Sequence, residues 1–135
     1  MAKGYDTNKE RLQTLSLFGK DLARRSKSTC ELSLSSGVPL KIYEIAPVPK
    51  EPIFENCLFL CEDTIQQLDS PKKHLKSDKW RHLRELIWSE LPQVQLMSVR
   101  ILSYIAKSEP WAQEILDEAY LEEELADLAA SAPLS

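Results

Sequence analysis

Two short motifs carry the residues best suited to metal chemistry in this 135-residue chain. Each begins with a cysteine and places a hydroxyl three residues later, so that Ser33 follows Cys30 and Thr64 follows Cys61. Two Cys-x-x-Cys pairs would form a structural zinc site, because four thiolates close a tetrahedron around the ion. Serine and threonine are not usual zinc ligands. We therefore expect no metal cofactor. If zinc is retained, its expected ligands are Cys30 and Cys61.

Other residues near these motifs offer alternative ligands. Cys57 lies four residues before Cys61, which in a strand separates them by roughly 13 Å, so we predict a small buried apolar role for it. His74 and His82 have no motif spacing to either cysteine. The competing hypothesis keeps zinc, with acids such as Asp63 replacing the thiols. If a zinc-site geometry is kept without the ion, Cys30 and Cys61 should face each other, close enough for a disulfide if their Cα atoms lie within about 7 Å.

A longer pattern surrounds the two motifs. It comprises residues 19–26 (GKDLARRS), 30–32 (CEL), 37–40 (GVPL), 42–44 (IYE), 47–49 (PVP) and 57–62 (CLFLCE). On these residues, the segment 20–69 resembles the zinc-ribbon region of PhnA-like proteins, a family named for a bacterial alkylphosphonate-uptake operon. The resemblance implies a bacterial protein with a ribbon hairpin. It places Cys30, Ser33, Cys61 and Thr64 at the four ligand positions, two of which have lost their cysteine.

Periodicity predicts the elements that position these motifs. Thr7 and Glu10 form a capping box, and apolar residues at three- and four-residue steps predict an amphipathic helix over about 7–27 with Leu12, Leu15, Phe18 and Leu22 inside. Residues 39–45 and 56–60 are β-prone and should pair antiparallel, joined by a proline-rich loop. Residues 64–68 should add a helical turn.

The remainder of the chain has helical patterns. We predict a helix capped by Ser77 or Asp78, a second beginning at Pro92 and a third beginning at Trp111. The tryptophans 80, 88 and 111 should be largely buried. The predicted fold is α+β: an N-terminal helix (1–28), a degenerate zinc-ribbon β-hairpin (29–70) and a C-terminal helical hairpin or three-helix unit with an acidic tail (71–135).

Charge and composition limit the functional classes. The net charge is −4, and no apolar run approaches the roughly 18 residues needed to span a bilayer. The basic residues Lys20, Arg24, Arg25 and Lys27 favour nucleic acid only weakly, because most face away from the apolar stripe and have no interleaved aromatics. No histidine–aspartate cluster or glycine-rich phosphate loop indicates an enzyme.

These observations favour a non-enzymatic interaction module of the bacterial cytoplasm, whose partner is another protein. The alternative is a weak nucleic-acid-binding protein that uses residues 20–27. A protein linked to phosphonate metabolism, as the resemblance implies, is the third hypothesis. The oligomeric state is not readable from the sequence.

Overall fold

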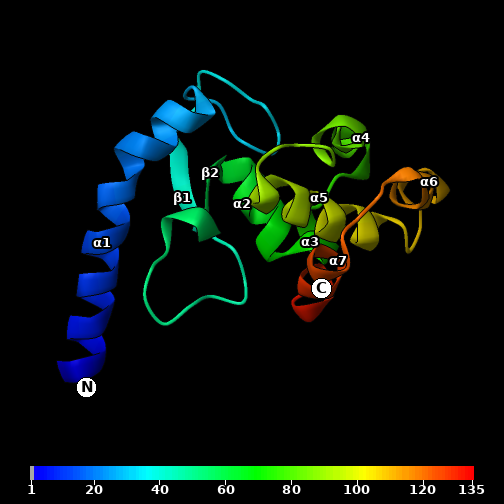
Figure 1. Cartoon of the computed structure of the whole chain (residues 1–135). Coiled ribbons are helices and arrows are strands. Elements are labelled where there is room, and N and C mark those ends of the chain that lie inside the picture. The colour runs from blue at the N-terminus through cyan, green and yellow to red at the C-terminus, as the bar shows by residue number, and fades with distance from the viewer. Residues whose placement is uncertain (1) are drawn as a thin grey trace.

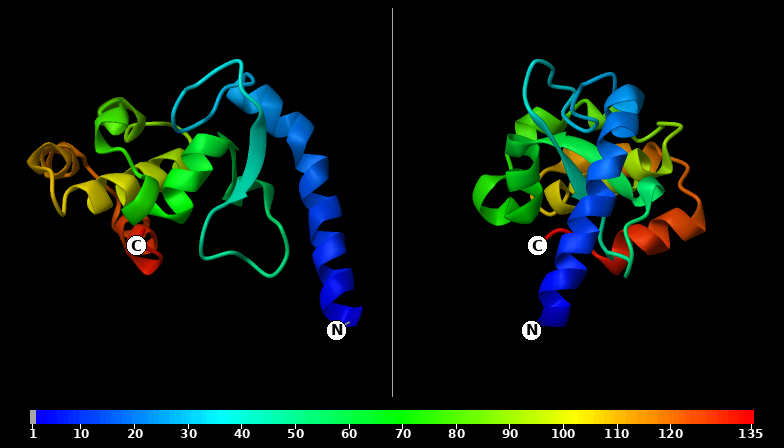
Figure 2. Two further views of the ribbon diagram at one scale, coloured as in Figure 1. Left: turned by 180° about the vertical axis from the view of Figure 1, so that it is seen from behind. Right: turned by 90° about the vertical axis from the view of Figure 1, so that its left-hand side faces the viewer.

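The chain folds as a mixed α+β protein with an N-terminal helix, one β-hairpin and a helical unit. The computed structural model describes residues 2–135, with side chains from Lys9 onward. Helix α1 (Ala2–Ser26) lies along one side of the hairpin, and the later helices lie on its other side (Figure 1; Figure 2). The hairpin therefore separates the long first helix from the helical unit.

The predicted hairpin is confirmed. Strands β1 (Leu40–Glu44) and β2 (Cys57–Cys61) pair antiparallel, with Leu40 opposite Cys61 and Glu44 opposite Cys57. The proline-rich loop joins them and ends in a single 3-10 turn, η1 (Phe54–Asn56). Because β2 alternates between two covered faces, four of its five residues are buried.

Helix α1 begins earlier than predicted. Its backbone is already helical at Ala2 and passes through Thr7, so the predicted capping box does not start the helix; the side chain of Thr7 lies outside the described residues. The predicted apolar stripe is only partly buried. Leu22 is fully buried and Phe18 packs edge-on against Phe54, whereas Leu12 remains 59% exposed. The helix is therefore anchored mainly through its C-terminal half.

Short helices follow β2 directly. Helix α2 (Glu62–Asp69) extends the predicted turn, and α3 (Pro71–His74) starts at a proline. The helix predicted from Ser77 is instead split into η2 (Ser77–Trp80) and α4 (Leu83–Leu86). Trp80 is buried as predicted, but the prediction for Trp88 is wrong because its side chain is 54% exposed. With the helix ending at Leu86, Ile87 turns inward and its neighbour Trp88 turns outward.

Three longer helices complete the fold. Helices α5 (Pro92–Ile105) and α6 (Pro110–Glu118) both begin with proline in the first turn, where its missing N–H is not needed. The acidic tail contains a separate helix, α7 (Glu123–Ser131), which the sequence analysis did not distinguish. Trp111, at the start of α6, is partly buried.

One hydrophobic core joins the hairpin to the helices. Apolar residues of α5 are buried there, among them Val94, Met97, Ile101, Leu102 and Ile105. They belong to the same cluster as Leu58 and Leu60 of β2. No helix in the described part of the chain is long and apolar enough to cross a membrane.

Candidate functional site

The four motif residues converge at one end of the hairpin. The Thr64 hydroxyl lies 3.5 Å from the Cys30 sulfur and 3.3 Å from the Cys61 sulfur. The Ser33 hydroxyl lies 3.7 Å from the Cys61 sulfur. Two thiols and two hydroxyls, which we call the thiol–hydroxyl cluster, are thus brought together from segments about thirty residues apart.

Local backbone structure explains this convergence. In the first motif, the turn closes through hydrogen bonds from the Leu34 amide to the Cys30 carbonyl and from the Ser33 amide to the Cys30 sulfur. Leu34 has a φ of 67°, the left-handed conformation that reverses the chain. In the second motif, Cys61 is the N-cap of α2 and Thr64 lies in its first turn.

Burial and hydrogen bonding act in opposite directions on the Cys30 thiol. Cys30 and Thr64 are fully buried, and Cys61 is 6% exposed. Burial raises the pKa of Cys30, but hydrogen bonds from Ser33, Thr64 and the backbone at Cys61 outweigh it and lower the pKa overall. Hydrogen bonding in the cluster therefore stabilises the Cys30 thiolate by more than burial destabilises it.

The other predicted ligand candidates lie elsewhere. His74 is exposed on α3, and Asp63 is exposed and accepts a hydrogen bond from Gln67. The Nε2 atom of His82 lies 2.7 Å from the Leu32 carbonyl oxygen, so this ring contacts the first motif through its backbone. Among the described residues, no three His, Cys, Asp or Glu side chains are grouped as a metal site.

Cys57 has the buried apolar role that the sequence predicts. It is fully buried at the start of β2, and its Sγ donates to the carbonyl of Ile53 at 3.3 Å. Burial raises the pKa of Cys57 to about 11. All three cysteines are free thiols.

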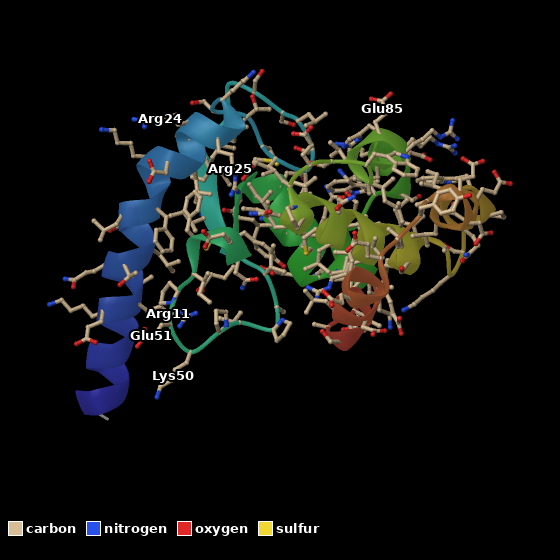
Figure 3. All side chains as sticks on the ribbon, in the orientation of Figure 1. Arg11, Arg24, Arg25, Lys50, Glu51 and Glu85 are labelled. Carbon is tan, nitrogen blue, oxygen red and sulfur yellow. The ribbon has the colours of Figure 1, made fainter. Side chains whose placement is uncertain are left out.

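The predicted basic segment of α1 is divided between two roles. Lys20, Arg24 and Lys27 are exposed. Arg25 instead turns toward the hairpin, where its guanidinium donates to both carboxylate oxygens of Glu31 at 2.7 and 2.9 Å and to the Cys57 carbonyl at 2.9 Å (Figure 3). Arg25 therefore fastens α1 to the hairpin and is not available to an external ligand.

A second arginine on α1 performs a similar task, which the sequence analysis missed. The guanidinium of Arg11 donates to Glu44 on β1 and to the carbonyls of Pro49 and Lys50 in the proline-rich loop (Figure 3). These contacts leave a cavity of about 460 Å³ between α1 and the loop. No local motif indicates a pair separated by 33 residues.

A longer basic segment was also missed. Residues 72–84 contain six exposed Lys or Arg and a single acid, Asp78. The ion pairs among the described residues involve none of these six cations. Arg81 lies over the Trp111 ring, 4.6 Å from its centroid, and lines a cavity of about 380 Å³ with His82 and Arg84. Counting charges in short windows would have found this segment.

Comparisons with known proteins identify no relative. No protein-family model, curated protein sequence or solved structure matches the chain. A function for this chain can therefore be inferred only from its own sequence and structure.

Proposed function

We propose that this chain is a non-enzymatic module that binds another protein in the bacterial cytoplasm. The binding surface, which we call the helix–loop face, consists of α1 residues 9–17 and loop residues 46–53. The observation that carries the proposal is the exposure of apolar side chains on both parts. Leu12 on α1 is 59% exposed, and Val48 and Ile53 in the loop are 52% and 48% exposed.

The helix–loop face is preorganised, because its two parts are held in place before a partner binds. Arg11 holds the loop against α1, so the cavity between them is bounded on both sides by hydrogen-bonded backbone. Exposed apolar side chains mark an interaction site where they form a contiguous patch, which is what we propose for Leu12, Val48 and Ile53. Proline also limits the flexibility of the loop, which reduces the entropy lost when a partner binds.

The thiol–hydroxyl cluster supports a structural role within this proposal. A thiol nucleophile must reach its substrate and be paired with a base. Cys30 is fully buried, and its side-chain partners are hydroxyls. We propose that the cluster is the site of a PhnA-like ribbon in which hydroxyls have replaced two metal-binding thiols.

Site-specific photocrosslinking in living cells tests the helix–loop face. A photoreactive amino acid placed at Leu12 or at Val48 should give the same discrete protein adduct. The matched control is Tyr120, which is 92% exposed between α6 and α7, far from α1 (Figure 1). No adduct from positions 12 and 48, or equal adducts from all three positions, would contradict the proposal.

Nucleic-acid binding is a second candidate, favoured by the basic segment 72–84. Six exposed cations and the Arg81–Trp111 stack combine phosphate-binding charge with an aromatic surface. This segment is a better candidate for nucleic-acid binding than residues 20–27, because Arg25 in the latter is already paired with Glu31.

Fluorescence anisotropy with a single-stranded RNA oligonucleotide over a salt series tests this candidate. Binding should weaken steeply with salt, and the Lys76→Glu/Lys79→Glu variant should bind much more weakly than the parent. The matched control is Lys20→Glu/Lys27→Glu, which changes charge equally on α1. Equal losses in both variants, or a flat salt response, would reject a site at 72–84.

A further inference from the structure

A largely apolar cavity of about 500 Å³ lies between α5, α6 and α7. This volume falls within the range of roughly 300–1,000 Å³ that is typical of small-molecule sites. Apolar side chains from all three helices and the adjoining segments line it, among them Val99, Leu116, Leu121, Ala126, Ala129 and Ala130. The cavity is separate from the thiol–hydroxyl cluster and from the helix–loop face.

The alanine-rich sequence of α7 accounts for this space. Ala126, Ala129 and Ala130 place only methyl groups opposite α5, where larger residues would fill the interface. A well-packed interior leaves few voids larger than a water molecule. The helices therefore leave an apolar cavity that opens to solvent at Ser103, Ala126 and Ala130.

The cation Arg100 lies in the wall of this cavity. Its residue is only 3% exposed, yet the ion pairs among the described residues do not include it. Its Nε donates to the carbonyl of Ala129 at 3.2 Å and its Nη2 to that of Leu128 at 2.8 Å. Its Nη1 contacts only the sulfur of Met97, at 3.9 Å.

These contacts leave the guanidinium incompletely satisfied. Arginine carries five N–H donors, more than its two backbone acceptors and one weak sulfur acceptor engage. The carbonyls at the C-terminal end of α7 supply only a partial negative charge. Burial accordingly lowers the pKa of Arg100, which is the expected response of a cation without an anionic partner.

We propose that this cavity binds an apolar monocarboxylate, such as a medium-chain fatty acid. The ligand carboxylate pairs with the guanidinium of Arg100, and its aliphatic tail occupies the alanine-lined space. Ser103, which also lines the cavity, lies three residues after Arg100 on the same face of α5 and supplies a further hydroxyl donor. A carboxylate provides the charge that Arg100 lacks, and the tail fills the volume that α7 leaves open.

Isothermal titration calorimetry of the full chain with octanoate tests this site, with 1-octanol and octylammonium as tail-matched probes. Octanoate should bind about tenfold more tightly than octanol, because one charge-assisted interaction separates the two. Octylammonium should bind weakest, since it brings a like charge to Arg100. Equal binding of octanoate and octanol, or no octanoate binding, would overturn the proposal.

Two variants distinguish a loss of octanoate binding from a loss of the folded structure. Arg100→Gln should weaken octanoate binding by about tenfold or more while leaving octanol binding unchanged. Because Arg100 also holds α7, the second variant is Ala126→Leu, which fills the cavity from its exposed rim and keeps the guanidinium. It should abolish octanoate binding without lowering the melting temperature.

The control for cavity filling is Gln113→Leu, which adds an equally apolar side chain on the exposed face of α6. It should bind octanoate like the parent. Unchanged octanoate affinity in both Arg100→Gln and Ala126→Leu would show that octanoate binds elsewhere and would overturn the assignment.

Discussion

At the scale of single residues, buried charged side chains connect segments that are distant in the sequence. Glu31 is 8% exposed, and its Oε1 accepts from both Arg25 and the Phe59 amide. One carboxylate thus joins α1, the first cysteine turn and β2. Removing one partner of a buried ion pair is costly because the remaining charge stays buried without compensation.

Arg25→Met should therefore lower the free energy of unfolding by roughly 3 kcal/mol, measured by chemical denaturation. The neighbouring variant Arg24→Met, on the exposed face, should change it by less than about 0.5 kcal/mol. Adding Glu31→Gln to Arg25→Met should recover part of the loss, because the unpaired charge is removed. A loss in Arg24→Met as large as that in Arg25→Met would contradict this account.

The raised pKa of Cys57 predicts that the protein loses stability at alkaline pH. The native pKa of Cys57, about 11, lies above the ordinary value of 9.0, so the unfolded thiol loses its proton first as pH rises. Its contribution is fully present below pH 9.0 and is lost as the pH approaches 11. Between these values the free energy of unfolding should fall by up to about 1.4 kcal/mol per pH unit.

The measurement is urea denaturation from about pH 8 to about pH 10, which stops near the ordinary pKa of tyrosine. The variant Cys57→Ala should lose this part of the slope, whatever its stability at neutral pH. Tyr43→Phe is the control, because burial also raises the pKa of Tyr43 and its effect belongs to higher pH. An unchanged slope in Cys57→Ala would refute the assignment.

At the scale of elements, sequence patterns were reliable where several residues repeated one signal. The strands and α5 follow from sustained β-prone or helical patterns; the strands were predicted to within one residue at each end, and α5 begins at Pro92 as predicted. The split between η2 and α4 was missed, because tertiary burial of Trp80 and Ile87 overrides a continuous helix. The cluster of Cys30 and Cys61 was found from motif spacing, whereas Arg11 and Arg100 depend on contacts between distant segments.

The split helix makes the two tryptophans of this region energetically different. Trp80→Ala should cost about 3–5 kcal/mol, because its ring is buried and its Nε1 donates to Gln67 at 2.9 Å. Trp88→Ala should cost less than about 1 kcal/mol, since the ring is half exposed. Thermal and urea denaturation of both variants checks this order. Equal losses in the free energy of unfolding would contradict this account and show that the Trp88 side chain is buried in solution.

At the scale of the whole molecule, one hydrophobic core includes both the hairpin and the helices. The buried residues of β2 lie in the same cluster as those of α5, so the hairpin is supported by the helices. In the thiol–hydroxyl cluster, the Thr64 hydroxyl lies 3.5 Å from the Cys30 sulfur and 3.3 Å from the Cys61 sulfur, and the Ser33 hydroxyl lies 3.7 Å from the Cys61 sulfur. This spacing suits four sulfurs around one zinc ion, which lie within about 4 Å of each other.

The variant Ser33→Cys/Thr64→Cys should therefore bind zinc at one ion per chain, measured by elemental analysis after dialysis against a weak chelator. Zinc should raise its melting temperature by roughly 10 °C or more, because a structural site supplies several kcal/mol of folding free energy. The matched control Ser36→Cys/Thr64→Cys places one thiol on an exposed residue outside the cluster and should retain no zinc. No zinc in the first variant would exclude a ribbon-like geometry.

The anchoring of α1 has a consequence for the order of events during synthesis. The helix leaves the ribosome before the hairpin, and its anchors, which include Glu31, Glu44, Phe54 and the backbone of Cys57, all emerge later. An isolated helix is marginal in water until it can dock. At about 5–20 residues per second, residues 27–59 take on the order of seconds to follow. The exposed leucines of the nascent helix are thus available to chaperones before the hairpin exists to receive it.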